Sequence, residues 1–350
     1  MPETVSNFEP ELKNLSFKIE SYLQNHFGKD TKITAFESLS GGACQDNYSI
    51  DLQLSNGSLK KMVMRTDKGE SLFSSLPKPI EFKICKIAFE NGVKTPEPIL
   101  LEINLTLLNK PFYFMERISG RGDGRFIVKD NSIAAYRNSE MVKDLARNLA
   151  KIHSVTPDKV SEKEIFHSLP VIEKESYVAK TLEDFKKTMD ATEEPHPAIY
   201  LVWNWLKANQ PPVDSIVLTH GDFRTGNFLI NPDGLQGILD WEFAHFGDRH
   251  EDIAWLCMRD WRFGKVNKEV GGFADRKEFY DLYSQFAGFV VDPVRVNYWE
   301  IMGNLRWAVG SIGQAWRHIS GKDKGIELAA IGRRTSELEF ECLKLIENAR

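Results

Sequence analysis

A short stretch near the middle of the chain carries polar side chains at spacings that could support chemistry. Asp222 follows His220 and Gly221, Asn227 comes five residues after Asp222, and Asp240 comes eighteen residues after it. Three short apolar runs precede or separate these groups: residues 216–218, 228–230 and 237–239. Such runs, bounded by turn residues, are typical of buried strands. We therefore expect the three polar side chains to lie at strand ends and to face one small space.

Phosphoryl transfer suits this set of groups. The reaction needs an aligned hydroxyl, an acceptor for its proton, and cations that neutralise the phosphate charge. Asp222 could accept or orient the hydroxyl proton, and Arg224 could meet the transferred phosphoryl group. Asn227 and Asp240 offer the oxygen ligands that Mg²⁺ prefers, with phosphate and water completing its shell. The pattern predicts a Mg²⁺-dependent enzyme with ATP or GTP as co-substrate.

The spacing Asp-x-x-x-x-Asn, followed by Asp on the next hairpin, also occurs in the kinase catalytic loop. With Gly before Asp222 and the triplet Asp240–Glu242, the run to Asp252 resembles the aminoglycoside phosphotransferase and choline kinase-like family. Within it, the chain looks most like the small-molecule kinases related to the domain fused to some acyl-CoA dehydrogenases. The resemblance implies a two-lobe α+β protein-kinase-like fold. Residues 1–117 would form a nucleotide-covering lobe with a small antiparallel sheet, and residues 118–350 a larger, mainly helical catalytic and acceptor-binding lobe. In this family the residue at the position of Asp252 braces the catalytic loop by hydrogen bonds.

Composition narrows the class of protein. A chain of 350 residues allows two large lobes, and its net charge of −5 argues against a nucleic-acid partner. No apolar run reaches the roughly 18 residues of a membrane span. The N-terminal residues lack the features of a signal peptide, and the four cysteines form no C-x-x-C pair. We expect a cytoplasmic protein with reduced thiols and no zinc site.

The first part of the chain predicts a helix followed by a strand meander. Apolar residues recur at helical spacing over residues 12–27, and Gly28 ends the segment. Strands are expected over residues 32–39, 48–54 and 59–65. Gly41 and Gly42 lie in the first turn, where the missing Cβ would let the backbone approach nucleotide phosphates. A Gly-Gly turn is also common in ordinary hairpins, so only its position supports this role.

The third strand ends in a cation. Kinases place Lys here to hold the phosphates. In this sequence Arg65 takes that place, and a guanidinium can also bind phosphate, so the replacement need not abolish activity. Lys61 faces the same side by strand alternation and is the alternative. Glu81 begins a helix expected over residues 80–91 and is the preferred partner of the cation, with Glu90 less favoured. An exposed first-turn carboxylate, favoured by the helix dipole, is the other interpretation of Glu81.

Two further strands, over residues 96–103 and 111–117, lead to the segment that joins the lobes. Backbone groups of Met115 and Arg117 could bind adenine there without a special side chain. The Gly-rich residues 118–125 are then the connector.

The second lobe is expected to be mostly helical. Helices are predicted over residues 141–153, 173–189, 198–208, 279–289, 294–319 and 325–348. His153 is expected at a helix end rather than in catalysis, and Asp248 is a plausible cap for the helix that begins near Asp252. Glu242 could touch a second metal or the acceptor, or serve as polar support. Four residues of the long penultimate helix could line an acceptor site: Asn304, Arg306, Trp307 and Arg317.

Taken together, these features predict a phosphotransferase that moves the γ-phosphoryl group of ATP or GTP to a hydroxyl of a small molecule. The resemblance favours a hydroxyacyl-type metabolite as acceptor. An aminoglycoside phosphotransferase is the alternative enzyme, and a catalytically silent nucleotide-binding scaffold is the alternative outside enzymes. A protein-substrate kinase is disfavoured because no Ala-Pro-Glu motif and no long activation loop follow Asp240. Oligomeric state does not follow from the sequence.

Overall fold

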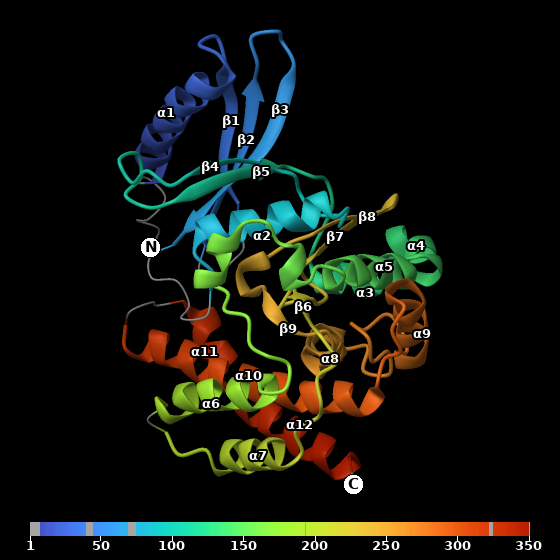
Figure 1. The fold of residues 1–350 in the computed structure, drawn as a ribbon. Helices are drawn as coiled ribbons and strands as arrows, with labels where there is room; N and C mark the ends of the chain where they lie inside the picture. Colours follow the sequence, from blue (N-terminus) through green and yellow to red (C-terminus); the bar gives the residue numbers. More distant parts are fainter. Residues whose placement is uncertain (1–7, 40–44, 69–74, 193, 322–324, 350) are drawn as a thin grey trace. The chain divides into compact units, whose positions relative to one another are not determined.

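The chain folds into two compact units in the computed structural model (Figure 1), which describes residues 8–39, 45–68, 75–192, 194–321 and 325–349. Unit 1 comprises Met1–Ser119 and Gln236–Phe243, and unit 2 comprises Gly120–Leu235 and Ala244–Arg350. The sequence-based division at residue 117 assigned residues 236–243 to the second lobe. They pack in unit 1 because Ile238 N–H donates to the Lys94 carbonyl and Trp241 Nε1 to Thr95 Oγ1.

Unit 1 is a five-stranded antiparallel sheet with two helices. Its elements are α1 (Phe8–Phe27), β1 (Lys32–Leu39), β2 (Gln45–Gln53), β3 (Leu59–Asp67), α2 (Lys78–Glu90), β4 (Pro98–Glu102) and β5 (Phe112–Glu116). The strand order is β1-β2-β3-β5-β4. A 3₁₀ turn at Trp241–Phe243 packs against α2. The expected leading helix and strand meander are confirmed, with ends shifted by a few residues.

The two faces of this sheet differ in chemistry because alternate residues of a strand point to opposite sides. One face packs on Ile19 and Leu23 of α1, and its fully buried residues are Ile50, Leu52, Met62, Met64, Phe112 and Phe114. Each such side chain contributes roughly 1.5–3 kcal/mol on burial. Arg65 lies at the alternate register, as do the polar side chains of Gln45, Asn47, Ser49 and Asp51 in β2. The apolar core therefore leaves the other face for polar groups.

Unit 2 is mainly helical. Its elements are α3 (Gly124–Lys129), α4 (Ala134–Ser139), α5 (Met141–His153), α6 (Tyr177–Asp190), α7 (Pro197–Ala208), β6 (Ile216–Thr219), β7 (Phe228–Asn231), β9 (His245–Asp248), α8 (His250–Cys257), α9 (Arg276–Ala287), α10 (Pro293–Ile319), α11 (Ile326–Gly332) and α12 (Thr335–Asn348). Strand β8 (Gly234–Ile238) pairs with β7 across the expected Asn-Pro-Asp-Gly turn, and the chain passes from unit 2 to unit 1 within it. Strand β6 pairs with β9.

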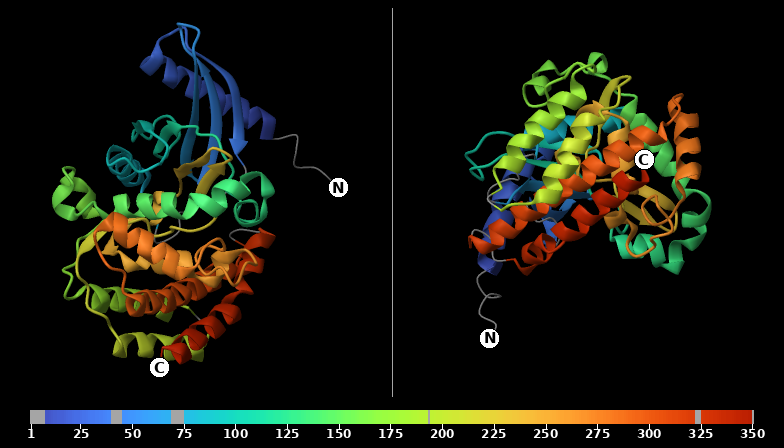
Figure 2. Two further views of the ribbon diagram at one scale, coloured as in Figure 1. Left: turned by 90° about the vertical axis from the view of Figure 1, so that its right-hand side faces the viewer. Right: turned by 90° about the horizontal axis from the view of Figure 1, so that it is seen from below.

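The long helix α10 organises unit 2. Helices α7, α8, α11 and α12 all pack on it, and α5 packs beside α9 (Figure 2). Fifteen of its residues are buried, from Arg295 to Gln314. Asp292 caps its first turn by accepting a hydrogen bond from Val294 N–H, and Pro293 supplies the fixed φ that suits a helix start.

The structure corrects three expectations for unit 2. The helix predicted over residues 325–348 is two helices: α11 ends at Gly332, where an added Cβ would lie 2.4 Å from the Ala315 Cβ, and α12 begins at Thr335. The helix α3 begins at Gly124, inside the expected connector of residues 118–125, and Asp123 caps it by accepting from Phe126 N–H at 2.8 Å; neither α3 nor α4 was predicted. Strand β9 was not predicted, since its four residues include Gly247 and Asp248 and show no strand pattern. Among the described residues, no helix is long and apolar enough to cross a membrane.

Candidate functional site

In unit 1, Arg65 lies between two carboxylates. Its Nε is 2.8 Å from Glu81 Oε1, and its Nη2 is 2.7 Å from Asp240 Oδ1. Arg65 comes from the end of β3, Glu81 from the first turn of α2, and Asp240 from the residues just after β8. The expected pair of Arg65 with Glu81 is present. Lys61 is exposed, and Glu90 is exposed with Lys86 3.8 Å away, so neither alternative joins this cluster.

Glu81 also binds two partners that sequence reasoning missed. Lys78 Nζ lies 2.7 Å from Glu81 Oε2 and 3.2 Å from Asp67 Oδ1, although the lysine is almost fully buried. Tyr113 Oη donates to Glu81 Oε1 at 3.0 Å. Lys78 lies at the start of α2, next to Pro79. Because proline is typical of loops and turns, the sequence around Lys78 did not indicate a buried cation. The three contacts fix the Glu81 carboxylate and with it the Arg65 guanidinium.

Burial and neighbouring charges have opposite effects on the pKa of Arg65. Burial alone would lower its pKa, but the Glu81 and Asp240 carboxylates raise the pKa well above the usual value for arginine. The guanidinium is therefore a permanent cation in this cluster. Burial raises the pKa of Glu242, whose Oε2 accepts from Ser75 Oγ at 2.7 Å. Its carbonyl accepts from Leu76 N–H, so Glu242 anchors the segment before α2.

Asp240 adopts the left-handed backbone conformation, with φ of 65°. A non-glycine residue in this region is uncommon and marks a conformation imposed by its surroundings. Asp240, Arg65, Glu81 and Met115 border a small cavity of about 30 Å³ in unit 1. The structure therefore places four of the expected nucleotide and metal residues around one cavity.

The remaining expected nucleotide residues have different outcomes. Arg117 N–H donates to the Lys61 carbonyl, and its guanidinium contacts Ser49 and lies 2.5 Å from Asp51 Oδ1. Because the Arg117 N–H already donates to a carbonyl, only the Arg117 C=O is left to contact adenine, and that contact stays a prediction. Gly41 and Gly42 lie outside the described residues, and their phosphate contacts stay a prediction.

In unit 2, Asp222 stands in a loop, residues 220–227, between β6 and β7. We call it the Asp222 loop. Gly221 and Gly226 both adopt positive φ, which lets the chain turn tightly on either side of Asp222 and Asn227. Asn227 N–H donates to the Arg224 carbonyl and closes the turn. The short strands thus hold the loop at both ends.

Asp222 is buried and accepts hydrogen bonds from three side chains. Trp255 Nε1 donates to Oδ1 at 2.7 Å, Arg224 Nε donates to Oδ1 at 2.9 Å, and Asn227 Nδ2 donates to Oδ2 at 2.6 Å. The expected group of Asp222, Arg224 and Asn227 is therefore assembled. Trp255 was not predicted as a partner, because nothing in its sequence position separates it from a core tryptophan.

Asp252 fixes the start of the Asp222 loop by hydrogen bonds to its backbone. Its carboxylate accepts from His220 N–H at 2.7 Å and Gly221 N–H at 2.9 Å, which is the bracing expected from the family resemblance. His153 Nε2 donates to the same carboxylate at 3.1 Å, and Tyr283 Oη bonds His153 Nδ1 at 2.7 Å. Burial opposes the charge of Asp252, yet the bonds from His153 and His220 lower its pKa. Burial lowers the pKa of His153, so this histidine is a neutral structural donor at the end of α5.

Arg224 and three of the α10 residues expected at the acceptor site have partners within unit 2. The Arg224 guanidinium stacks over the Trp261 ring, 4.4 Å from its centroid. Arg306 is 3.8 Å from Glu251, and Arg317 bonds Gln314, so both belong to pairs within unit 2. Trp307 Nε1 donates to Asp260.

The donor chemistry fits a magnesium nucleotide. The described residues contain no cluster of three or more His, Cys, Asp or Glu that could bind a metal ion. Magnesium, however, binds through one or two protein oxygens together with substrate phosphates and water. The Asp240 carboxylate and the amide oxygen of Asn227 are oxygens of this kind, and the Asn227 Nδ2 is already committed to Asp222.

Comparison with known proteins identifies the family. Residues 36–289 match the model of the Phosphotransferase enzyme family. Acyl-CoA dehydrogenase family member 11 of Rattus norvegicus is 29% identical over 255 residues, 69% of this chain and 30% of its own length. Probable acyl-CoA dehydrogenase IBR3 of Arabidopsis thaliana is 28% identical over 249 residues, 67% of this chain and 29% of its own length. The chain thus spans less than a third of these curated relatives.

Solved structures share the fold. One is a Ralstonia eutropha JMP134 protein provisionally described as an aminoglycoside phosphotransferase, with a TM-score of 0.73, 20% identity, and coverage of 95% of this chain and 98% of that one. Another is spectinomycin phosphotransferase in complex with ADP and spectinomycin, with a TM-score of 0.60, 16% identity, and coverage of 93% and 98%. These likenesses confirm the predicted kinase-like fold class. Because the family model covers more than half of the chain, the chain belongs to the phosphotransferase enzyme family.

Proposed function

We propose that this protein transfers the γ-phosphoryl group of ATP to a hydroxyl of a small molecule. The observation that carries the proposal is the assembly of Asp222, Asn227 and Arg224 in one loop, each in hydrogen-bond contact with another. In the proposed step the acceptor oxygen bonds to the γ-phosphorus as the bond to the β,γ-bridging oxygen breaks. The hydroxyl proton goes to the Asp222 carboxylate, and ADP leaves.

Each polar residue has a role in this proposal. Arg65, held by Glu81 through Nε, would bind the α- and β-phosphates through its terminal N–H groups, which requires its Nη2 to leave Asp240. Asp240 and Asn227 are the proposed Mg²⁺ ligands, and the ion would neutralise phosphate charge. Arg224 pairs with the transferred phosphoryl group, which requires its Nε to leave Asp222. Met115 and Arg117 border the base, and Gly41 and Gly42 cover the phosphates.

The acceptor is proposed from relatives and remains open to test. The names of the curated relatives are those of acyl-CoA dehydrogenases, which favours a hydroxylated acyl-type metabolite. GTP is the alternative donor, and an aminoglycoside is the alternative acceptor, as in the spectinomycin complex. A silent nucleotide-binding scaffold is disfavoured because the described site lacks none of the expected acidic and amide groups.

Thermal unfolding with and without nucleotide tests the donor site. MgATP at about 100 times its dissociation constant should add roughly 2.7 kcal/mol to the unfolding free energy. The midpoint should then rise by a few degrees with MgATP, and less with ATP alone. Asp240→Asn should lose the Mg²⁺-dependent part of the rise.

The matched control is Asp233→Asn, which changes an exposed aspartate in the hairpin turn before Asp240. It should respond to MgATP like the wild type. A wild-type unfolding midpoint that does not change with MgATP would contradict the proposed nucleotide site. The protein would then be interpreted as a catalytically silent scaffold. GTP in place of ATP in the same assay decides the donor.

A further inference from the structure

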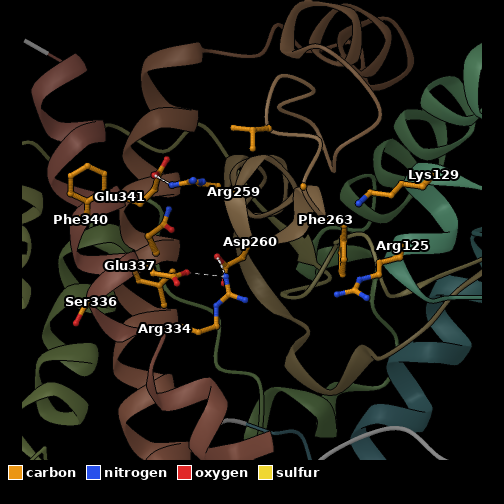
Figure 3. Close-up of a pocket in the computed structure, with 14 residues that line it drawn as sticks. Arg125, Lys129, Arg259, Asp260, Phe263, Arg334, Ser336, Glu337, Phe340 and Glu341 are labelled. Atoms are coloured by element: carbon orange, nitrogen blue, oxygen red, sulfur yellow. Dashed lines mark hydrogen bonds and ion pairs between the residues drawn. The ribbon is translucent and has the colours of Figure 1, made fainter.

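Unit 2 contains a large pocket lined by residues of α3, α10, α12 and the segment after α8. Its volume is about 1050 Å³. Figure 3 shows Arg125, Lys129 and Phe263 on one side of it and residues of α12 on the other, with the Arg334–Asp260 pair between them. Nothing in the nucleotide argument uses this pocket, and its lining residues all belong to unit 2.

The pocket connects to Asp222 through packed aromatic side chains. Arg224, bonded to Asp222, stacks on Trp261, and the Trp261 ring lies 5.8 Å from that of Trp307. Trp307 Nε1 donates at 2.7 Å to Asp260, which lines the pocket. A continuous chain of side-chain contacts therefore links the proposed catalytic carboxylate to the pocket wall within the same unit.

The charges of the lining are not balanced. The carboxylates are already paired: Asp260 lies 2.7 Å from Arg334, Glu337 lies 3.6 Å from Arg334, and Glu341 lies 3.5 Å from Arg259. Arg125 and Lys129 lie one helical turn apart on α3 and are exposed. Across the described part of the chain, neither has a carboxylate within ion-pair distance. The four cations and three carboxylates of the lining leave a net excess of one positive charge, and the two cations without an ion-pair partner among the described residues both lie on α3.

Asn304 supplies a second, independent sign of a ligand. This residue of α10 lines the pocket and is only 1% exposed. Its Nδ2 donates to the Glu300 carbonyl at 2.8 Å, but its Oδ1 has no hydrogen-bond partner among the described residues. A buried carbonyl oxygen without a partner costs stability, and a hydroxyl or N–H of a bound molecule would satisfy it.

We propose that this pocket binds the phosphate acceptor, and that the acceptor is a hydroxylated molecule with an anionic end. A carboxylate or phosphate group of the acceptor pairs with Arg125 and Lys129, and one of its polar hydrogens is donated to Asn304 Oδ1. The apolar side chains of Phe263, Val266 and Leu338 in the lining suit an aliphatic body between these ends. The proposal rests on the proposed phosphotransfer, and it disfavours a polycationic acceptor such as an aminoglycoside.

Binding of matched probes to the full chain tests the charge preference without catalysis. The probes are 6-hydroxyhexanoate, 6-hydroxyhexyl phosphate, 1,6-hexanediol and 6-amino-1-hexanol, measured by ligand-observed saturation-transfer NMR at low salt. The two anionic probes should bind about five to ten times more tightly than the diol, since each partly exposed charge pair contributes up to about 1 kcal/mol. The amine should bind most weakly. The ratio of the two anions distinguishes a carboxylate from a phosphate acceptor.

Two variants locate the binding. Arg125→Gln combined with Lys129→Gln should bring the anionic probes to within about twofold of the diol. The matched control, Lys143→Gln with Lys277→Gln, changes two exposed lysines outside the lining and should keep the preference. Asn304→Ala should weaken all the probes that bind by about tenfold, because one hydrogen bond to a buried oxygen is lost. Asn138→Ala, at an exposed position of α4, is its control.

Several results would overturn this assignment: binding of none of the probes, equal binding of all of them, tighter binding of the amine, or a preference that survives the double glutamine variant. The MgATP midpoint shift is measured on the same samples. A lost anion preference with an intact MgATP shift overturns the acceptor assignment alone. A lost MgATP shift in the wild type overturns the proposed phosphotransfer itself.

Discussion

At the scale of single residues, the two carboxylates Asp222 and Asp252 differ in what they face. Asp222 accepts bonds from side chains that a substrate could displace, Arg224 above all. Asp252 accepts bonds from backbone N–H groups of the Asp222 loop and from buried His153, so its oxygens are committed to the fold. The first is therefore suited to proton transfer and the second to positioning.

Replacement of Asp222 by Asn tests its chemical role. The amide keeps the size of the side chain but cannot accept the hydroxyl proton, so turnover should fall by roughly 10²–10⁴-fold. ADP release from MgATP in the presence of the acceptor probe that binds most tightly measures this, and the thermal midpoint checks folding. Asp233→Asn is the control and should keep its rate. If Asp222→Asn turned over at a rate near that of the wild type, Asp222 would not be the acceptor of the hydroxyl proton.

The His153–Asp252 pair predicts how stability depends on pH. Burial lowers the pKa of His153 in the folded chain, below the value near 6.5 of an unfolded one. As pH falls below about 6.5, the unfolded chain binds a proton that the folded chain does not. The unfolding free energy should therefore decrease, by up to about 1.4 kcal/mol for each pH unit from this group.

Denaturant unfolding between pH 7.5 and 5 measures this slope. We expect His153→Gln to be less stable at pH 7.5 but to have a flatter profile as the pH falls, whereas His167→Gln, at an exposed position, should follow the wild type. Parallel profiles for His153→Gln and the wild type would contradict the assignment.

At the scale of elements, α1 is built to cover one face of the unit 1 sheet. Its residues Ile19 and Leu23 are fully buried with apolar residues of β2, β3 and β5, while Phe17 on the same helix is 71% exposed. Covering the apolar face fixes the register of β3, and a shift of one residue would turn Arg65 away from Glu81 and Asp240.

Paired variants on α1 measure this packing. Leu23→Ala should lower the unfolding free energy by roughly 2–5 kcal/mol, the usual cost of emptying a buried leucine site. Phe17→Ala should change it by less than about 0.5 kcal/mol, because the side chain is exposed. Chemical denaturation of both variants gives the comparison, and equal losses would show that the burial of Leu23 is not what holds the helix.

At the scale of the whole molecule, the chain forms two compact units. The chain leaves unit 1 after Ser119, returns for Gln236–Phe243, and then continues in unit 2. Chains with more than one compact unit commonly depart from two-state unfolding. The division therefore has a thermodynamic consequence.

Differential scanning calorimetry tests it. The calorimetric enthalpy should exceed the van't Hoff enthalpy in the absence of ligand. Leu23→Ala in unit 1 and Leu305→Ala in unit 2, both at buried positions, should lower different components of the transition. Equal enthalpies, with both variants shifting one common transition, would mean that the units unfold together.

The amino-acid sequence alone determined the local parts of this protein. The Asp222 loop, the hairpin before Asp240 and the helix α5 follow from turn residues and short-range periodicity, which act between neighbours in the chain. The pairing of Arg65 with Glu81 was expected from the kinase plan, in which a helix Glu pairs with the strand cation. The family resemblance supplied the bracing role of Asp252.

Only the tertiary structure decided the long-range partners. The bond of Trp255 to Asp222 and the bond of Tyr113 to Glu81 each join residues more than 30 positions apart in the sequence. The pocket of Arg125, Lys129 and Asn304 is the clearest case, because α3 and α10 are separated by more than 160 residues. Propensity and spacing describe one segment at a time. Burial and charge compensation arise only when segments pack, and these properties gave the pocket its cations and its unpartnered amide oxygen.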